Sequence, residues 1–313
     1  MSTTLEQARE ELRRRQGAGA RYDAADAPAR ELAWARTGTA YFARKLNELT
    51  DEDLFGPSLL PGWTRAALVA HVGYNARALT RLCEWARTGV ETPMYASTEQ
   101  RNAEIDRGAT LPARALRNLF AHAEVHLNVE WRDLTDHQWD HEVRTAQGRT
   151  VPARETAWMR AREVWVHAVD LDNAGSFRDF PADLLDELLA DVVRAWARRP
   201  EAVEIVLAPA DRGEQVTVGE GTGPTVTGTT ADLVRWLTGR GARRLTSTTG
   251  ELPKIPRWFC PAGAKDRLPP ALSLLYGSCS VEGELAVRRA RRAACRPAQR
   301  PVMKAGARPP TYP

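Results

Sequence analysis

The sequence lacks long apolar runs and paired cysteines. No stretch of its 313 residues is apolar for long enough to cross a bilayer, and Met1–Glu6 lacks the basic and then apolar order of a signal peptide. The cysteines are Cys83, Cys260, Cys279 and Cys295, and none belongs to a Cys-x-x-Cys pair, which excludes a zinc ribbon and a thioredoxin-like redox site. Internal repeats are absent too. We therefore expect a cytoplasmic protein without a membrane span.

The net charge of +4 is unevenly spread along the chain. Residues 261–313 hold ten Lys/Arg and three Asp/Glu, so the first 260 residues carry a net charge of −3. The main body is therefore mildly acidic, which argues against nucleic-acid binding by the folded part. Residues 260–313 are largely Arg, Ala and Pro without sustained periodicity, and we expect disorder there. A nucleic-acid-binding basic tail is the alternative.

Helical periodicity gives way to strand periodicity along the chain. Helices are predicted at 28–49, 65–87, 111–134, 153–173 and 182–198. Their length and moderate connections suggest a bundle. Short strands at 203–207, 215–218 and 224–227 precede a helix at 231–237 that Thr230 caps, which predicts a small α+β domain. The predicted division is an exposed leader (1–26), a helical bundle (27–200), an α+β domain (201–259) and a tail (260–313).

The predicted helix 153–173 carries a carboxylate and an imidazole four residues apart. Glu163 and His167 are separated by about one turn and point the same way, and Asp170 continues that strip. The rest of this helix is apolar on most sides, which indicates burial. A buried carboxylate needs a partner that compensates its charge, and we expect that partner to be a metal ion.

A third candidate ligand comes from another helix. His71 and Asn75 lie within the apolar stripe of helix 65–87, so both face the core. A lone core histidine is usually only hydrogen-bonded, but Glu163 and His167 complete a His2Glu set, which holds catalytic zinc and leaves a fourth position open. That position would activate water or bind a thiol as thiolate, and residue spacing does not decide between them. Nitrogen and oxygen ligands also suit other divalent ions.

Other reactive side chains fit plainer roles. His122 and His126 are also one turn apart, but they lie on the flank of their helix's apolar stripe, and His137 with His141 falls in a predicted loop or short turn. We expect surface or boundary positions for the first pair and solvated ones for the second. Cys83 is predicted to be a small core residue rather than a nucleophile.

Several separated segments form an ordered series along residues 27–259. They are Leu60-Pro61-Gly62-Trp63-Thr64-Arg65, Val69-Ala70-His71-Val72, Asn75-Ala76-Arg77-Ala78-Leu79, Pro93-Met94-Tyr95, Gly148-Arg149, Val151-Pro152-Ala153, Trp158-Met159-Arg160, Arg162-Glu163-Val164-Trp165-Val166-His167-Ala168-Val169-Asp170-Leu171 and Leu252-Pro253-Lys254-Ile255-Pro256-Arg257-Trp258. In order and spacing this series resembles the mycothiol-dependent maleylpyruvate isomerase family. Residues after Phe259 depart from the family pattern, so catalysis should not depend on them.

The resemblance implies a fold, a cofactor and a reaction. The fold is a four-helix DinB-like bundle carrying zinc, followed by a sterol-carrier-like α+β domain, and the zinc ligands are His71, Glu163 and His167. The cofactor mycothiol binds zinc as thiolate and adds to the cis double bond of maleylpyruvate; rotation about the new single bond and elimination give fumarylpyruvate. Asp170 then supports His167 rather than acting as a base.

The resemblance also assigns a role to Arg240. It matches a family arginine implicated in activity, and a guanidinium fork suits a carboxylate of the substrate. Without the resemblance, we would interpret Arg240 only as a positive charge that is stabilised by the helix dipole at the C-terminal end of a helix.

Three functions are compatible with this sequence. We favour zinc- and mycothiol-dependent isomerisation of maleylpyruvate in gentisate breakdown. The same metal and thiol would also serve mycothiol S-transfer to electrophiles. A third possibility is a non-enzymatic, metal-stabilised binding module whose basic tail engages an acidic partner. For the favoured function we expect a monomer that takes a small dicarboxylate and a thiol, with neither a membrane nor a nucleic-acid partner.

Overall fold

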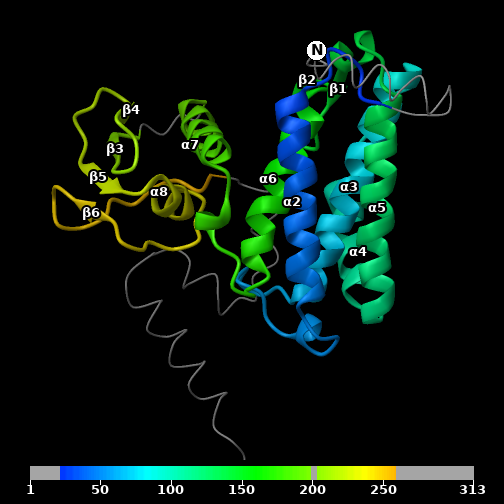
Figure 1. The fold of residues 1–313 in the computed structure, drawn as a ribbon, viewed down its shortest axis with the longest axis horizontal. Coiled ribbons are helices and arrows are strands. Elements are labelled where there is room, and N and C mark those ends of the chain that lie inside the picture. Colours follow the sequence, from blue (N-terminus) through cyan, green and yellow to red (C-terminus); the bar gives the residue numbers. More distant parts are fainter. Residues whose placement is uncertain (1–21, 199–202, 259–313) are drawn as a thin grey trace, which may run out of the picture. The chain divides into compact units, whose positions relative to one another are not determined.

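The computed structural model describes residues 22–198 and 203–258, all within one compact unit (Figure 1). The predicted tail and most of the predicted leader lie outside the described residues. At the end of that leader, the Asp23 carboxylate accepts two hydrogen bonds from the Arg36 guanidinium, at 2.6 and 2.7 Å. Within the described ranges, no helix is long and apolar enough to span a membrane. The cytoplasmic location stays a prediction.

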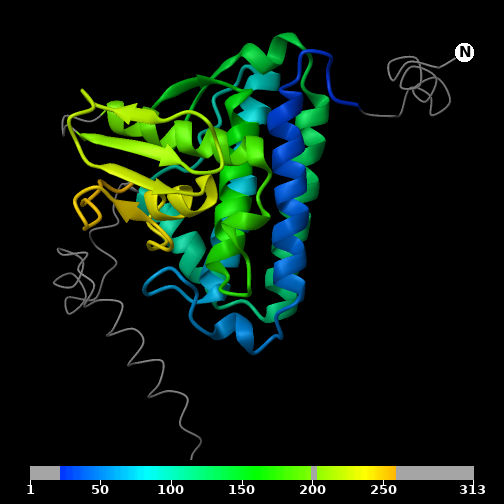
Figure 2. The ribbon, with the colours of Figure 1, turned by 60° about the vertical axis from the view of Figure 1, so that its left-hand side comes forward.

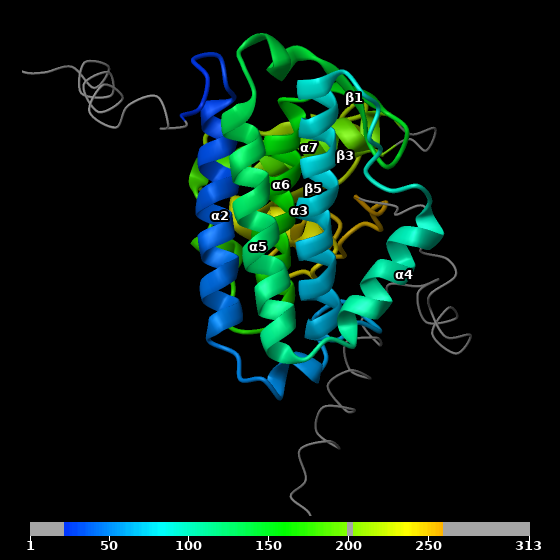
Figure 3. The same cartoon turned by 90° about the vertical axis from the view of Figure 1, so that its right-hand side faces the viewer.

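The N-terminal part is rich in helices, as predicted. They are α2 (Ala29–Asn47), α3 (Arg65–Thr88), α4 (Thr98–Ala109), α5 (Ala113–Asp133) and α6 (Glu155–Asp170), with short 3₁₀ helices η1 (Asp53–Phe55), η2 (His137–Asp140) and η3 (Phe177–Asp179) in connections. Helix α3 packs against α4, α5 and α6, and α2 packs against α6. The long helices run alongside one another, whereas α4 is inclined to them (Figure 3).

Helix α3 begins and ends where its sequence predicts. The Thr64 hydroxyl accepts a hydrogen bond from Ala67 N, and Gly89 ends the helix in the left-handed region with φ of 74°. The apolar face between these residues is buried against the neighbouring helices. That face also buries His71 and Asn75, as their positions in the stripe predict. Packing of α3 therefore brings an imidazole into the protein interior.

The structure adds elements that periodicity did not predict in this part. Helix α4 is one of them. The other is a hairpin of β1 (Glu142–Arg144) and β2 (Thr150–Pro152), in which Val143 pairs with Val151. Each strand has three residues and buries mainly its central valine, so the alternation was too short to recognise.

The C-terminal part contains a small sheet, as predicted, and the structure shows that this sheet is mixed. Helix α7 (Ala182–Ala197) precedes β3 (Ile205–Pro209), β4 (Val216–Val218), β5 (Thr225–Gly228), α8 (Thr230–Leu237) and β6 (Thr246–Ser247). The strand order is β4-β3-β5-β6, with β3 and β5 parallel and the other pairs antiparallel (Figure 2). Helix α8 packs on α7, β3 and β5. Strand β6 was not predicted, and Thr229 rather than Thr230 caps α8.

Charged contacts join the two parts. The Asp191 carboxylate on α7 accepts hydrogen bonds from Arg162 Nη1 on α6 and from Trp258 Nε1, each at 3.2 Å to Oδ2. Arg240, in the loop that follows α8, donates to Asp170 at the C-terminal end of α6, so this loop lies next to the candidate site.

Candidate metal centre

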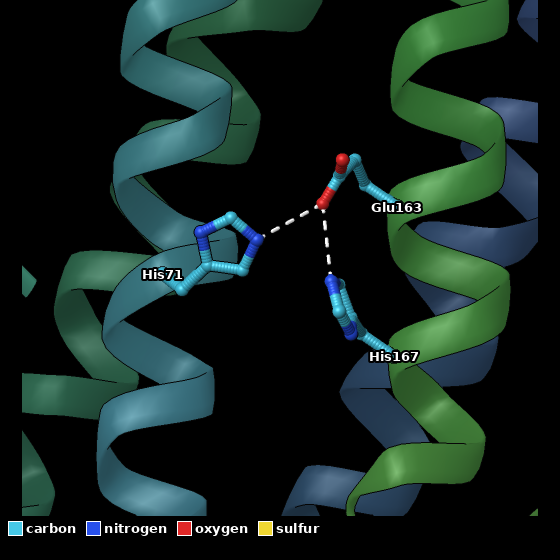
Figure 4. A group of neighbouring side chains, drawn as sticks. All are labelled: His71, Glu163 and His167. Carbon is cyan, nitrogen blue, oxygen red and sulfur yellow. Dashed lines mark hydrogen bonds and ion pairs between the residues drawn. The ribbon is translucent and has the colours of Figure 1, made fainter. Parts of the chain in front are cut away.

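His71, Glu163 and His167 meet between α3 and α6 (Figure 4). His71 Nε2 lies 3.1 Å from Glu163 Oε2, and His167 Nε2 lies 3.2 Å from the same oxygen. The two imidazole rings are nearly perpendicular, with centroids 5.0 Å apart. Both rings thus direct a nitrogen at one carboxylate oxygen. The structure brings together the three residues that the sequence selected as ligands.

The group is largely buried but still accessible. His71 is 7% exposed, whereas the side chains of Glu163 and His167 retain 21% and 14% of their exposure. The α3 stripe sets the burial of His71, and the spacing of four residues on α6 puts Glu163 and His167 on one face. Solvent therefore reaches the two α6 side chains.

Burial and hydrogen bonding set the charge states. Burial lowers the pKa of His71 to about 4, so this imidazole is neutral near pH 7. Burial raises the pKa of Glu163, but hydrogen bonds from His167 and His71 outweigh it and hold that pKa well below its usual range. Burial lowers the pKa of His167, and its hydrogen bonds with Asp170 and Glu163 outweigh that effect and raise it. Metals bind neutral imidazole and ionised carboxylate, so His71 and Glu163 already have the binding form, whereas a metal would have to displace a proton from His167.

The three side chains fit a divalent metal ion. One ligand atom from each can be chosen so that all three lie within 4.8 Å of one another. Ligands around tetrahedral zinc are separated by roughly 3.4 Å, close to the two nitrogen–oxygen distances given above. Within residues 22–198 and 203–258, no other group of three or more His, Cys, Asp or Glu side chains meets this condition.

The other candidates lie away from this group. His122 and His126 are exposed on α5, and His137 is exposed at the start of η2. His141 is partly buried rather than solvated, because its Nδ1 contacts a backbone carbonyl at the end of α3. Cys83 is fully buried, which confirms its predicted core position, and burial raises the pKa of its thiol to about 12.

Asp170 contacts Nδ1 of His167, the ring nitrogen that is not directed at Glu163. It is fully buried, and its Oδ2 lies 2.9 Å from His167 Nδ1. This contact holds a proton on Nδ1 and directs Nε2 toward Glu163. Burial raises the pKa of Asp170, but the charge of Arg240 and the hydrogen bonds from His167 and Arg240 outweigh it and lower the pKa to about 2. Asp170 is therefore ionised and orients the ring, as the sequence predicted.

Arg240 forms a bidentate ion pair with Asp170. Its Nε and Nη2 donate to the two carboxylate oxygens at 3.1 and 2.6 Å, and its Nη1 donates to Thr238 O at 2.6 Å. Arg240 reaches this position because Gly239, with φ of 82°, reverses the chain after α8. A cavity of about 180 Å³ lies beside the pair and is lined by Leu59, Leu60, Pro61, Asp170, Arg235, Gly239 and Arg240. The predicted catalytic role of Arg240 stays a prediction.

Aromatic and basic side chains that sequence reasoning left unassigned lie beside His71 or beside its neighbour Arg101. The Trp63 ring meets the imidazole edge-on, with centroids 5.7 Å apart. Arg101 Nη2 lies 3.4 Å from His71 Nδ1, and Arg101 Cζ lies 6.0 Å from the centroid of the Tyr95 ring. Trp63 and Tyr95 belong to the segments that carry the family resemblance, but Arg101 does not. Arg101 was missed because its helix, α4, was not predicted.

A helix-rich domain with two histidines and a glutamate arranged as metal ligands, followed by a small α+β part, defines the class of this protein as a candidate metalloenzyme. The family model for the mycothiol maleylpyruvate isomerase N-terminal domain matches residues 35–172, and the model for the C-terminal domain of the same family matches residues 179–257. The chain belongs to this enzyme family, and the resemblance inferred from the sequence is confirmed.

Solved structures agree with this assignment. A crystal structure of a mycothiol-dependent maleylpyruvate isomerase is 46% identical, with a TM-score of 0.71, and the match covers 74% of this chain and 96% of that chain. A crystal structure of such an isomerase with a histidine-to-alanine mutation is 45% identical, with the same TM-score and coverage. A search of curated proteins found no match.

Proposed function

We propose that this chain catalyses the zinc- and mycothiol-dependent isomerisation of maleylpyruvate to fumarylpyruvate. The observation that carries the proposal is the convergence of His71 Nε2, His167 Nε2 and Glu163 Oε2 in one accessible group. Family membership and the names of the two related structures supply the substrate and the thiol. The proposed route is addition of the thiol to the cis double bond, rotation about the resulting single bond, and elimination.

Zinc, when bound, supplies stabilisation of a thiolate, which makes a thiol nucleophilic at neutral pH. The chain's own residues prepare the site for the ion. His71 offers a neutral Nε2, and Glu163 offers an ionised carboxylate. Asp170 keeps the ring proton of His167 on Nδ1, which leaves Nε2 to act as a ligand.

In this proposal Arg240 acts through Asp170. Its fork compensates the buried carboxylate, and that carboxylate in turn orients His167. Arg240 is therefore a positioning residue that ties the loop after α8 to a metal ligand. This role would explain a requirement for the arginine without direct contact between its guanidinium and the substrate.

We also propose that α2, α3, α5 and α6 form the four-helix DinB-like bundle expected from the sequence. The packing of α3 on α5 and α6, and of α2 on α6, supports this arrangement. The two family models meet between residues 172 and 179, and α7 packs against α8. We therefore assign α7 to the α+β domain, which moves the proposed domain boundary from residue 200 to that interval.

The test is to mix the zinc-loaded protein with mycothiol and maleylpyruvate and to follow isomerisation. His71→Ala should lose both zinc and turnover, because one of the three ligands is missing. His126→Ala is the matched control, since His126 is an exposed histidine on α5 away from the site. Equal rates for wild type and His71→Ala would overturn the site assignment. Mycothiol transfer to an electrophile without isomerisation would favour the S-transferase alternative.

A further inference from the structure

An arginine without an acidic partner lies beside the metal-ligand group. Arg101, in the first turns of α4, has Nη2 3.4 Å from His71 Nδ1 and Nη1 3.3 Å from Asn102 Oδ1. Within the part of the chain that the structure describes, no carboxylate lies within ion-pair distance of its guanidinium. The side chain is only partly buried. Its charge is thus available to an anion that enters the site.

Close packing of α4 on α3 fixes the position of Arg101. Gly108 faces α3, and a methyl group there would lie 2.6 Å from Ala70 Cβ and 2.8 Å from the Tyr74 ring. Ala70 directly precedes His71 in the sequence. Because only a glycine permits this approach, α4 is held against the turn of α3 that carries the histidine.

The Tyr95 ring lies next to both Arg101 and a second arginine. Its ring centroid is 6.0 Å from Arg101 Cζ and 5.8 Å from Arg81 Cζ. Arg81 donates from Nε and Nη2 to Met94 O at 3.0 and 2.6 Å, which holds the segment before Tyr95 in place. Burial raises the pKa of Tyr95 to about 12, so its hydroxyl keeps its proton and remains a donor near pH 7.

Arg240 differs from Arg101 in its existing bonds. Two of its nitrogens donate to Asp170 and the third to Thr238 O. A substrate carboxylate would have to displace Asp170, which is fully buried and holds His167. Arg101 needs no such exchange, because its contacts are with a histidine nitrogen and an amide oxygen.

We propose that Arg101 and Tyr95 bind a carboxylate of the substrate at the edge of the metal-ligand group. This inference rests on the proposed function, since maleylpyruvate carries two carboxylates. A histidine that gives Nε2 to a metal keeps its proton on Nδ1, so His71 Nδ1 and Arg101 Nη2 are then both donors. At 3.4 Å apart they can share one carboxylate oxygen. We assign the other oxygen to the hydroxyl of Tyr95, because the Tyr95 ring lies beside Arg101.

The test measures binding of maleate, a cis-dicarboxylate, to zinc-loaded full-length protein by calorimetry without mycothiol. Arg101→Met should keep full zinc content and weaken maleate binding by about tenfold or more, because a charge-assisted hydrogen bond is lost. Arg101→Lys should recover part of the affinity, and Tyr95→Phe should lose several-fold. Arg107→Met, an exposed position on the same helix, is the matched control and should behave as wild type. The KM for maleylpyruvate should rise in the same order.

The outcomes separate this inference from the proposed function. Unchanged maleate affinity and KM in Arg101→Met would overturn it, as would a wild type that does not bind maleate at millimolar concentration. Loss of zinc in both Arg101→Met and Arg101→Lys would assign Arg101 a structural role and also overturn it. A wild type that binds zinc and maleate through Arg101 but does not isomerise maleylpyruvate would refute the proposed function and leave the carboxylate site standing.

Discussion

Replacement of Asp170 by asparagine tests the chain of contacts from Arg240 through Asp170 to His167. The change keeps the shape of the side chain but removes the charge that accepts from both partners. His167 Nδ1 and the Arg240 fork then compete for one amide oxygen. We expect weaker zinc binding and a less stable protein, for different reasons.

The two magnitudes follow from the local geometry. Loss of the carboxylate behind a metal-binding histidine lowers metal affinity by about 10- to 100-fold, or roughly 1.4 to 2.7 kcal/mol. Arg240, whose side chain is 16% exposed, is left buried without its counter-charge, and breaking such a pair costs about 3–5 kcal/mol of unfolding free energy. The double variant Asp170→Asn with Arg240→Met removes the unpaired charge. It should recover part of the stability and none of the zinc affinity.

Zinc competition with a chromophoric chelator and urea unfolding measure the two quantities separately. Asp232→Asn is the matched control, because Asp232 is also a buried aspartate paired with an arginine, but it has no contact with a metal ligand. It should lose stability and keep zinc affinity. A zinc affinity for Asp170→Asn within twofold of wild type would refute the proposed role of Asp170. A double variant no more stable than Asp170→Asn would refute the explanation from an unpaired Arg240.

Further predictions concern packing, pH and chain length. Gly38→Ala should lower the free energy of unfolding, measured by urea titration, by about 1–3 kcal/mol, because its methyl group would lie 2.5 Å from the Trp165 ring. Gly213→Ala is the control and should change this free energy little, because nothing lies within 4 Å of the added methyl group. Burial raises the pKa of Tyr41 to about 12, so its contribution to stability is present below pH 10 and is lost as the pH rises toward 12. Tyr41→Phe should therefore remove roughly 2–3 kcal/mol of the alkaline decrease in the free energy of unfolding. Identical pH profiles of that free energy for the two proteins would contradict this. Removal of residues 260–313 should leave isomerisation unchanged, because the family match ends at residue 257, and loss of turnover would show that the tail takes part.

The convergence of the three candidate ligands could be expected because these residues depart from a strong apolar pattern. His71 interrupts the apolar stripe of a capped helix, and Glu163 with His167 forms a polar strip on a helix that is otherwise apolar on most sides. Burial and the need for charge compensation were therefore both visible in the sequence. Helical periodicity does not say which helices touch. The packing of α3 against α6 came from the structure, and so did the second bonding partner of Asp170.

Elements with a weak apolar pattern could not be predicted in the same way. Helix α4 buries mainly Ile105 and Gly108, so its sequence shows no stripe. A signal was nevertheless present, because Ser97 and Gln100 have the spacing of a capping box, and the Ser97 hydroxyl accepts from Gln100 N. Recognition of that start would have placed Arg101 on a helix near Tyr95.

Arg160 illustrates a different limit of sequence reasoning. Arginine is usually exposed, yet this side chain is fully buried, with Nη1 donating to Val72 O and to Asn75 Oδ1, both at 2.8 Å. It also pairs with Glu124 of α5. Asn75 was correctly placed facing the core, but its partner comes from a helix 85 residues further along the chain and follows from no local rule.

In the proposed zinc enzyme, the Arg240–Asp170 ion pair would make zinc binding and the attachment of the C-terminal part thermodynamically reciprocal. A metal that favours the oriented form of His167 also favours the ionised form of Asp170. Because Asp170 binds Arg240, the metal then favours the docked state of the loop after α8, and docking of this loop raises the metal affinity by the same factor. Removal of zinc should therefore increase amide hydrogen exchange in α8, although no residue of that helix is among the ligands. The α+β part would thus act as a remote reporter of whether the ion is in place.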